Sequence, residues 1–170
     1  VRGVWNDMNE PAIFEVESKT LPLDVRHDYD GNPCSHRKAH NVYGMQMARA
    51  SYEGVKKFSY PNRPLIITRS GYSGLQRYSS VWTGDNIASW RHLWIANAQC
   101  QRLAVSGISF AGSDVGGFIE QPTPELFYRW VQLAVFHPFF RTHSSGDHGE
   151  QEPWSFGKEA LDLSRAAIEL

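Results

Sequence analysis

Two short segments place a carboxylate among polar and aromatic side chains directly after an apolar run. Residues 5–11 read Trp-Asn-Asp-Met-Asn-Glu-Pro and contain Asp7, and residues 82–86 read Trp-Thr-Gly-Asp-Asn and contain Asp85. A carboxylate among amide and backbone donors stays ionised, as a nucleophile or an electrostatic stabiliser must. A carboxyl against the apolar wall of Trp82 is expected to hold its proton and to act as a general acid. Two carboxyl groups with these opposite tendencies indicate glycoside hydrolysis.

Each segment also has a simpler interpretation. Residues 5–11 could form a solvated loop in which the Asp and Asn side chains cap backbone groups. Residues 85–86 could form a turn with Asn86 at a positive φ angle. The aromatic side chains near both carboxylates favour the glycosidase hypothesis, because such rings fit the faces of sugars.

A third polar cluster lies in the glycine-rich segment 112–118, Gly-Ser-Asp-Val-Gly-Gly-Phe. Its glycines do not follow the G-x-G-x-x-G order of a dinucleotide-binding loop, so that function is not favoured. We expect a shaped loop in which Asp114 binds substrate hydroxyls or a nearby Arg. A tight turn between a strand and a helix is the alternative.

Several other chemistries do not fit their patterns. The three histidines in residues 137–148 lack the H-E-x-x-H spacing, and Pro138 interrupts the helix that would align them. The Asp-Tyr-Asp-Gly segment at 28–31 does not complete a calcium loop, because positions one and twelve would hold Arg26 and Arg37. No segment completes the G-x-S-x-G or Walker lysine pattern. The sequence therefore predicts neither a metal nor a cofactor.

Composition narrows the class of protein further. The 170 residues carry 17 Lys+Arg against 18 Asp+Glu, a formal charge of −1, so no basic field is present to hold nucleic acid by its phosphates. No apolar run approaches the length of a membrane span. The two cysteines, Cys34 and Cys100, lack metal or redox spacing and are predicted to be structural.

The pattern of short apolar runs and helical periodicity predicts alternating strands and helices. Such alternation implies a parallel α/β sheet, either doubly wound or closed into an eight-stranded barrel. In both folds the chemistry lies at the carboxyl ends of strands, where Asp7, Arg69, Asp85 and Asp114 are expected. The expected strands are residues 1–5, 65–68, 80–83 and 107–111, and the expected helices are residues 41–58, 93–105, 126–136 and 158–170.

These segments together resemble the family 31 glycoside hydrolases, whose nucleophile motif is Trp, a variable residue, then Asp-Met-Asn-Glu. Residues 5–10 match that motif with Asn in the variable place. The resemblance continues in order along the whole chain. It takes in residues 34–44, 68–70, 82–86, 112–118, 141–143 and 152–157.

The resemblance implies a retaining α-glycosidase on a (β/α)8 barrel, with Asp7 as nucleophile and Asp85 as general acid and base. It also implies that Arg69, Asp114 and His143 bind sugar hydroxyls. By the same carry-over, Trp5, Met8, Trp82 and Phe118 wall the sugar-binding subsite. The expected partner is an α-linked oligosaccharide. If the barrel geometry is kept, the two catalytic carboxyls should lie ~5 to 6 Å apart.

The length also suggests how much of the barrel is present. A complete barrel needs about 250 residues. We therefore expect residues 1–170 to be a C-terminal-half portion of the barrel, strands 4 to 7 with their helices and loops, with the remaining strands and the β-domains of the family outside it. Such a piece alone should expose apolar faces and lack turnover.

Within the family, α-glucosidase activity is expected because it is the commonest. α-Xylosidase, transglycosylase, lyase and sulfosugar hydrolase activities share the motifs, and a non-catalytic carbohydrate-binding homologue is the alternative from another class. No N-x-S/T sequon occurs, which favours the bacterial cytoplasm or periplasm over a glycosylated lumenal location.

Overall fold

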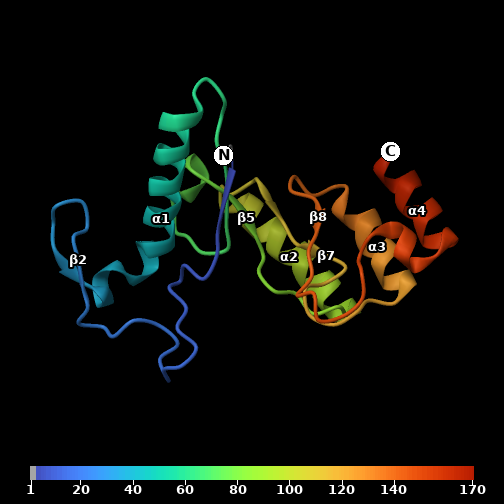
Figure 1. Cartoon of the computed structure of the whole chain (residues 1–170), viewed down its shortest axis with the longest axis horizontal. Coiled ribbons are helices and arrows are strands. Elements are labelled where there is room, and N and C mark those ends of the chain that lie inside the picture. Colours follow the sequence, from blue (N-terminus) through green and yellow to red (C-terminus); the bar gives the residue numbers. More distant parts are fainter. Residues whose placement is uncertain (1–2) are drawn as a thin grey trace. The chain divides into compact units, whose positions relative to one another are not determined.

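Parallel strand pairing organises each half of the chain. The structure is a computed structural model that describes residues 3–170, and the chain divides into two compact units, Val1–Ser80 and Val81–Leu170. Figure 1 shows the course of both units, and each is described by itself.

The first unit is built on two parallel strands and one long helix. Strand β1, Gly3–Asn6, pairs residue for residue with β4, Leu65–Thr68, and helix α1, His36–Ser59, packs against both. Ile66 of β4 and Ala48 of α1 are buried where helix and strand meet. The shorter elements are β2 Arg26–His27, β3 Cys34–Ser35 and the 3-10 turn η1 Leu75–Arg77.

A cluster of three histidines fixes the start of α1. The fully buried ring of His36 has Nδ1 3.0 Å from Nε2 of His27, on β2, and Nε2 3.0 Å from Nδ1 of His40. Thr20 Oγ1 lies 3.2 Å from the same Nε2. Burial lowers the pKa of His36, and the neighbouring His40 and His27 lower it further. Both effects favour the neutral form of the ring.

The second unit combines two parallel strand pairs with three helices. Strand β5 pairs with β6, and β7 pairs with β8, both in parallel. Helices α3 and α4 lie side by side, as Figure 1 shows. In chain order the elements are β5 Ser80–Trp82, α2 Trp90–Val105, β6 Ala111–Gly112, β7 Asp114–Val115, α3 Pro124–Ala134, β8 Arg141–Thr142, η2 Pro153–Phe156 and α4 Lys158–Ile168.

Helix caps and an aromatic core hold this second unit. The Ser89 side chain accepts a hydrogen bond from the His92 N–H at the start of α2, and the Thr123 side chain accepts one from the Leu126 N–H at the start of α3. Pro124 at the first helical position suits the same start. The buried core is formed by Ala96, Val115, Leu126, Phe127, Trp130, Val131 and Ala134.

The α/β alternation predicted from the sequence is confirmed, with shifted boundaries. Helix α1 begins at His36 rather than at residue 41, because His36 and Ala39 are buried and extend the helical face. The strand predicted at 107–111 is wrong for most of its length. Gly107, at φ 87°, follows the end of α2, and β6 begins only at Ala111. Of the strand predicted at 1–5, residues 1–2 lie outside the described residues.

Within residues 3–170, no helix is both long enough and apolar enough to cross a membrane.

Candidate active site

The first cluster of polar side chains follows the two parallel strands of the first unit. Asp7 comes directly after β1 and Arg69 directly after β4, and the parallel pairing brings them together. Arg69 Nε lies 3.1 Å from Asp7 Oδ1 and 2.9 Å from Glu10 Oε1. The Met8 N–H donates a hydrogen bond to Asp7 Oδ1 at 2.7 Å. A guanidinium and a backbone donor thus hold a carboxylate that remains exposed to solvent.

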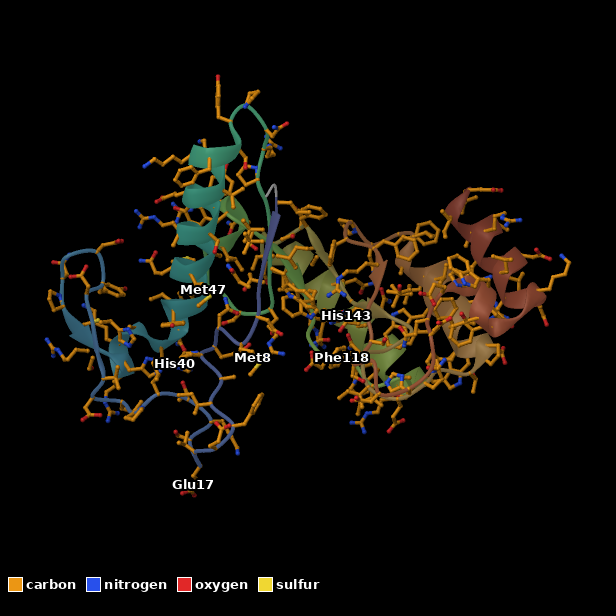
Figure 2. The ribbon with its side chains drawn as sticks, viewed as in Figure 1. Met8, Glu17, His40, Met47, Phe118 and His143 are labelled. Atoms are coloured by element: carbon orange, nitrogen blue, oxygen red, sulfur yellow. The ribbon has the colours of Figure 1, made fainter. Side chains whose placement is uncertain are left out.

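Met8 adopts a backbone conformation that is unusual for a residue with a side chain. Its φ angle is 58°, in the left-handed region, and such strain clusters at functional sites. The Met8 side chain, labelled in Figure 2, is 39% exposed. Its Sδ lies 3.2 Å from Nη2 of Arg69. Trp5, at 45% exposure, is also accessible. Both side chains are therefore available to contact a ligand.

The two asparagines beside Asp7 do not donate to its carboxylate. Asn9 is fully buried, and its Nδ2 donates to Thr68 Oγ1 at 2.9 Å. Asn6 is also buried, and its Oδ1 accepts a hydrogen bond from Ser51 Oγ at 3.0 Å. The expectation that amides surround Asp7 is wrong, because in a strand and the turn after it these side chains point into the protein. They fasten the Asp7 segment to β4 and α1.

Asp85 lies in an exposed turn after β5. The positive φ angle of this turn, 85°, belongs to Gly84, and Asn86 is not at positive φ. Asn86 is buried, and its backbone oxygen accepts hydrogen bonds from the N–H groups of Phe118 and Ile119. The expected burial of Asp85 against an apolar wall is not found, because Asp85 is exposed while the Trp82 ring is enclosed.

Asp114 has the opposite environment. Its side chain has no exposed surface, and its Oδ1 lies 3.0 Å from Nη2 of Arg141. The Arg141 guanidinium lies 6.0 Å from the Trp82 ring centre and 5.5 Å from that of Phe139. Burial lowers the pKa of Arg141 and the charge of Asp114 opposes that change. Of the two roles expected for Asp114, this geometry supports contact with an Arg.

His143 and Phe118 form a stacked pair in the second unit. Their ring centres are 4.9 Å apart with an interplanar angle of 26°, and Figure 2 shows the two side chains next to each other. His143 follows directly after β8 and lines a pocket of about 440 Å³ formed by segments within residues 142–152. A sugar hydroxyl could reach this imidazole from the pocket.

Most of the predicted site residues thus fall into one cluster in each unit. The first unit brings together Asp7, Met8 and Arg69, and the second unit brings together Trp82, Asp114, Phe118 and His143 through Arg141 and the β7–β8 pair. Glu10 and Arg141 were not predicted to have a role, although both belong to matched motifs. In the part of the chain that the structure describes, no three His, Cys, Asp or Glu side chains form a group that could hold a metal ion.

Comparison with known proteins links this geometry to one family. Residues 1–170 match the family described as "Glycosyl hydrolases family 31 TIM-barrel domain". "Alpha-glucosidase 2" of Bacillus thermoamyloliquefaciens is 48% identical over 170 residues, which is all of this chain and 22% of that protein. "Neutral alpha-glucosidase AB" of Homo sapiens is 43% identical over 166 residues, 97% of this chain and 17% of that protein.

Solved structures give the same result. The crystal structure of an ER glucosidase II heterodimeric complex matches 96% of this chain and 18% of its own, with a TM-score of 0.90 and 38% identity. A family 31 α-glucosidase from Bacteroides thetaiotaomicron matches 99% of this chain and 26% of its own, with a TM-score of 0.87 and 40% identity. The chain therefore spans between 17% and 26% of the length of these four proteins.

Proposed function

Because the chain belongs to glycosyl hydrolases family 31, with its parallel α/β fold part of a TIM-barrel domain, we propose that it contributes the catalytic carboxylates of a retaining α-glucosidase. The observation that carries the proposal is the setting of Asp7 after β1, where Arg69 Nε at 3.1 Å and the Met8 N–H at 2.7 Å hold one carboxylate oxygen. Such donors hold a carboxylate in one orientation for attack. The α-glucosidase names of the relatives favour a glucosyl substrate.

The proposed reaction is a double displacement. A carboxylate oxygen of Asp7 attacks the anomeric carbon. As the bond between the anomeric carbon and the glycosidic oxygen breaks, Asp85 donates its proton to that oxygen. The sugar is then held as an ester on Asp7. Asp85, now a carboxylate, takes a proton from water, which attacks the same carbon and releases the sugar with its anomeric configuration retained.

The exposed position of Asp85 fits a residue that must exchange protons with the leaving group and with water. In the active enzyme we expect a distance of ~5 to 6 Å between the Asp7 and Asp85 carboxyls, as retention requires.

The remaining expected residues bind and enclose the sugar. Arg69 and His143 are proposed as hydroxyl ligands, and both carry polar atoms at accessible positions after a strand. The proposed walls of the subsite are Trp5, Met8 and Phe118. Trp82, expected as a fourth wall, is only 1% exposed and does not present its ring to a ligand. Hydroxyl contacts that strengthen only at the oxocarbenium-like transition state raise the rate of the chemical step.

We further propose that residues 1–170 are the C-terminal-half portion of the barrel, strands 4 to 7, of a longer protein. Support comes from the barrel's need for about 250 residues. Large apolar side chains on the second unit, Trp94 at 66% and Trp154 at 65% exposure, would then be covered by further parts of the same protein. Sugar contacts from the other strands would decide between glucose and xylose.

The test uses the full-length protein that carries this chain, assayed on p-nitrophenyl α-glucoside and α-xyloside, with the product anomer followed by NMR. We expect α-glucoside hydrolysis with a retained anomer. Asp7→Asn should abolish turnover and leave folding intact, since it replaces the nucleophile with an isostere. Asp162→Asn, an exposed substitution on α4, is the matched control. Wild-type turnover in Asp7→Asn would overturn the proposal.

A further inference from the structure

We propose that the buried Asp114 carboxylate and the partly buried Arg141 guanidinium form an ion pair that positions His143 and Phe118, and that Asp114 itself does not contact the sugar. The proposal rests on the proposed function, because it assigns the pair a role in that same site. It gives Arg141 a positioning role and replaces the direct hydroxyl contact expected of Asp114.

The burial of Asp114 argues against a sugar contact. A hydroxyl ligand needs an oxygen that a substrate can reach, but the Asp114 side chain has no exposed surface. Its neighbours Ser113 and Val115 are fully buried as well, and Ser113 Oγ accepts a hydrogen bond from the enclosed indole N–H of Trp130 at 3.1 Å. Asp114 is thus part of the interior of the second unit.

The strand register shows what the ion pair holds together. Asp114 of β7 is paired with Arg141 of β8, so the backbone ladder and the 3.0 Å ion pair join the same two residues. The ladder continues one residue further, to the pairing of Val115 with Thr142, and His143 is the next residue along the chain. The orientation of His143 therefore depends on a strand that Asp114 anchors by both its backbone and its side chain.

Phe118 is tied to the same pair from the other side. The N–H of Gly117 donates to the backbone oxygen of Asp114 at 3.0 Å, which closes the turn that carries Phe118. The Phe118 N–H then donates to the backbone oxygen of Asn86 at 2.6 Å, next to Asp85 in the chain. The Phe118 ring stacks on His143. A shift at Asp114 would move both rings of this stack.

Two aromatic rings, as well as the ion pair with Asp114, hold the guanidinium of Arg141 in place. It lies close to the Trp82 and Phe139 rings, at the distances of cation–π contacts. Its planar group can stack on a ring and bind a carboxylate at once, which a lysine ammonium cannot do. Removal of the Arg141 cation would take this counter-ion away from a carboxylate that has no exposed surface. The ring contacts and the ion pair together restrict the Arg141 side chain, and the restricted pair positions His143 and Phe118.

The test is a set of double-mutant cycles in the full-length protein, with kcat and KM measured on p-nitrophenyl α-glucoside. Rates are expressed per active site, counted by titration with an activated fluoroglucoside, so that loss of folded protein does not lower them. We expect Asp114→Asn and Arg141→Met each to lower kcat by about 10²-fold, the typical effect of a misplacement near 1 Å. Asp114→Asn combined with Arg141→Met should be no slower than the slower single variant.

The decisive cycle pairs Asp114→Asn with His143→Ala. If Asp114 acts through His143, Asp114→Asn should cost much less than 10²-fold once His143 has been removed. If Asp114 binds a hydroxyl of its own, the two losses should multiply, and this result would overturn the proposal. A normal kcat per active site in Asp114→Asn would overturn it as well, because the pair would then be merely structural.

A conservative variant and a control complete the design. Arg141→Lys keeps a cation but loses the planar group, and we expect it to fold and to retain a kcat below that of the wild type. Full wild-type kcat in Arg141→Lys would contradict the positioning role. The control pair is Glu125 and Arg129 on α3, an exposed ion pair at 3.9 Å, whose variants should leave kcat unchanged. Absence of wild-type turnover would refute the proposed function instead, and so the two failures are distinguishable.

Discussion

The two glycines of helix α1 should respond in opposite ways to the same substitution. A Cβ added at Gly44 would lie 2.5 Å from Ser70 Oγ and 2.7 Å from the Ser70 backbone oxygen, whereas a Cβ added at Gly54 would meet no atom within 4 Å. Alanine in a helix interior is favoured over glycine by about 0.5–1 kcal/mol. Gly54→Ala should therefore stabilise α1 by roughly that amount.

At Gly44 the steric overlap outweighs this gain. The Ser70 side chain can rotate away, but its backbone oxygen cannot, so α1 and the segment after β4 must separate. Overpacking of this kind costs about 1–3 kcal/mol. The clash with a backbone oxygen places the cost in the upper part of that range, about 2–3 kcal/mol, which leaves Gly44→Ala destabilised by roughly 1–2 kcal/mol after the gain in helix propensity is subtracted. Because Arg69 precedes Ser70, the contact between Arg69 and Asp7 at 3.1 Å should loosen and kcat should fall.

Amide hydrogen exchange of residues 36–59 in the full-length protein measures both effects. We expect exchange in Gly44→Ala to be faster by about 5- to 30-fold, and exchange in Gly54→Ala to be slower than in the wild type. Equal protection in the two variants would refute the steric argument.

Three further predictions follow from the buried groups of the two units. Because the pKa of His36 is lowered, the stability that its neutral ring contributes should be complete above its unfolded pKa of about 6.5 and lost as the pH falls below that value. Protection of α1 from hydrogen exchange should therefore drop between pH 7.5 and 5, and it should drop in the same way in the control variant His148→Gln. A flat pH profile would contradict this assignment to His36. Burial raises the pKa of the Cys100 thiol to about 11. Iodoacetamide at pH 8 should therefore leave this thiol unmodified until the protein is denatured. Rapid labelling of the native protein would disprove the burial of Cys100. Trp130→Phe removes the hydrogen bond to Ser113 and should cost about 1–3 kcal/mol, measured by exchange in α3. Arg129→Lys, at an exposed position of the same helix, should be nearly neutral. Equal effects of the two substitutions would be inconsistent with a stabilising hydrogen bond from Trp130.

The sequence predicts the long elements of this fold well, because they have periodicity. The helical stripes and the apolar run at residues 65–68 are confirmed, with shifts at their ends. The paired strands β7 and β8 were not predicted, because two-residue strands are too short to show alternation. Their pairing is what joins Asp114 to Arg141, so the partner of Asp114 could not be chosen from the sequence alone.

The site residues show the same limit. Asp7 and Arg69 follow neighbouring strands, and the rule that polar groups gather at strand ends is enough to bring them together. Asn9 lies within the same motif, but its side chain points inward to Thr68. The direction of a side chain after a strand depends on the turn geometry, here the positive φ angle of Met8, and no residue pattern signals that angle.

The central claim is that Asp7 is a nucleophile, and covalent trapping tests it most directly. The full-length protein is incubated with an activated fluoroglucoside, whose glycosyl ester turns over slowly, and the labelled peptide is identified by mass spectrometry. A retaining mechanism predicts a single glucosyl ester on Asp7, in step with loss of activity. An ester on Asp85 or Glu10, or an active enzyme that forms no ester, would contradict the account.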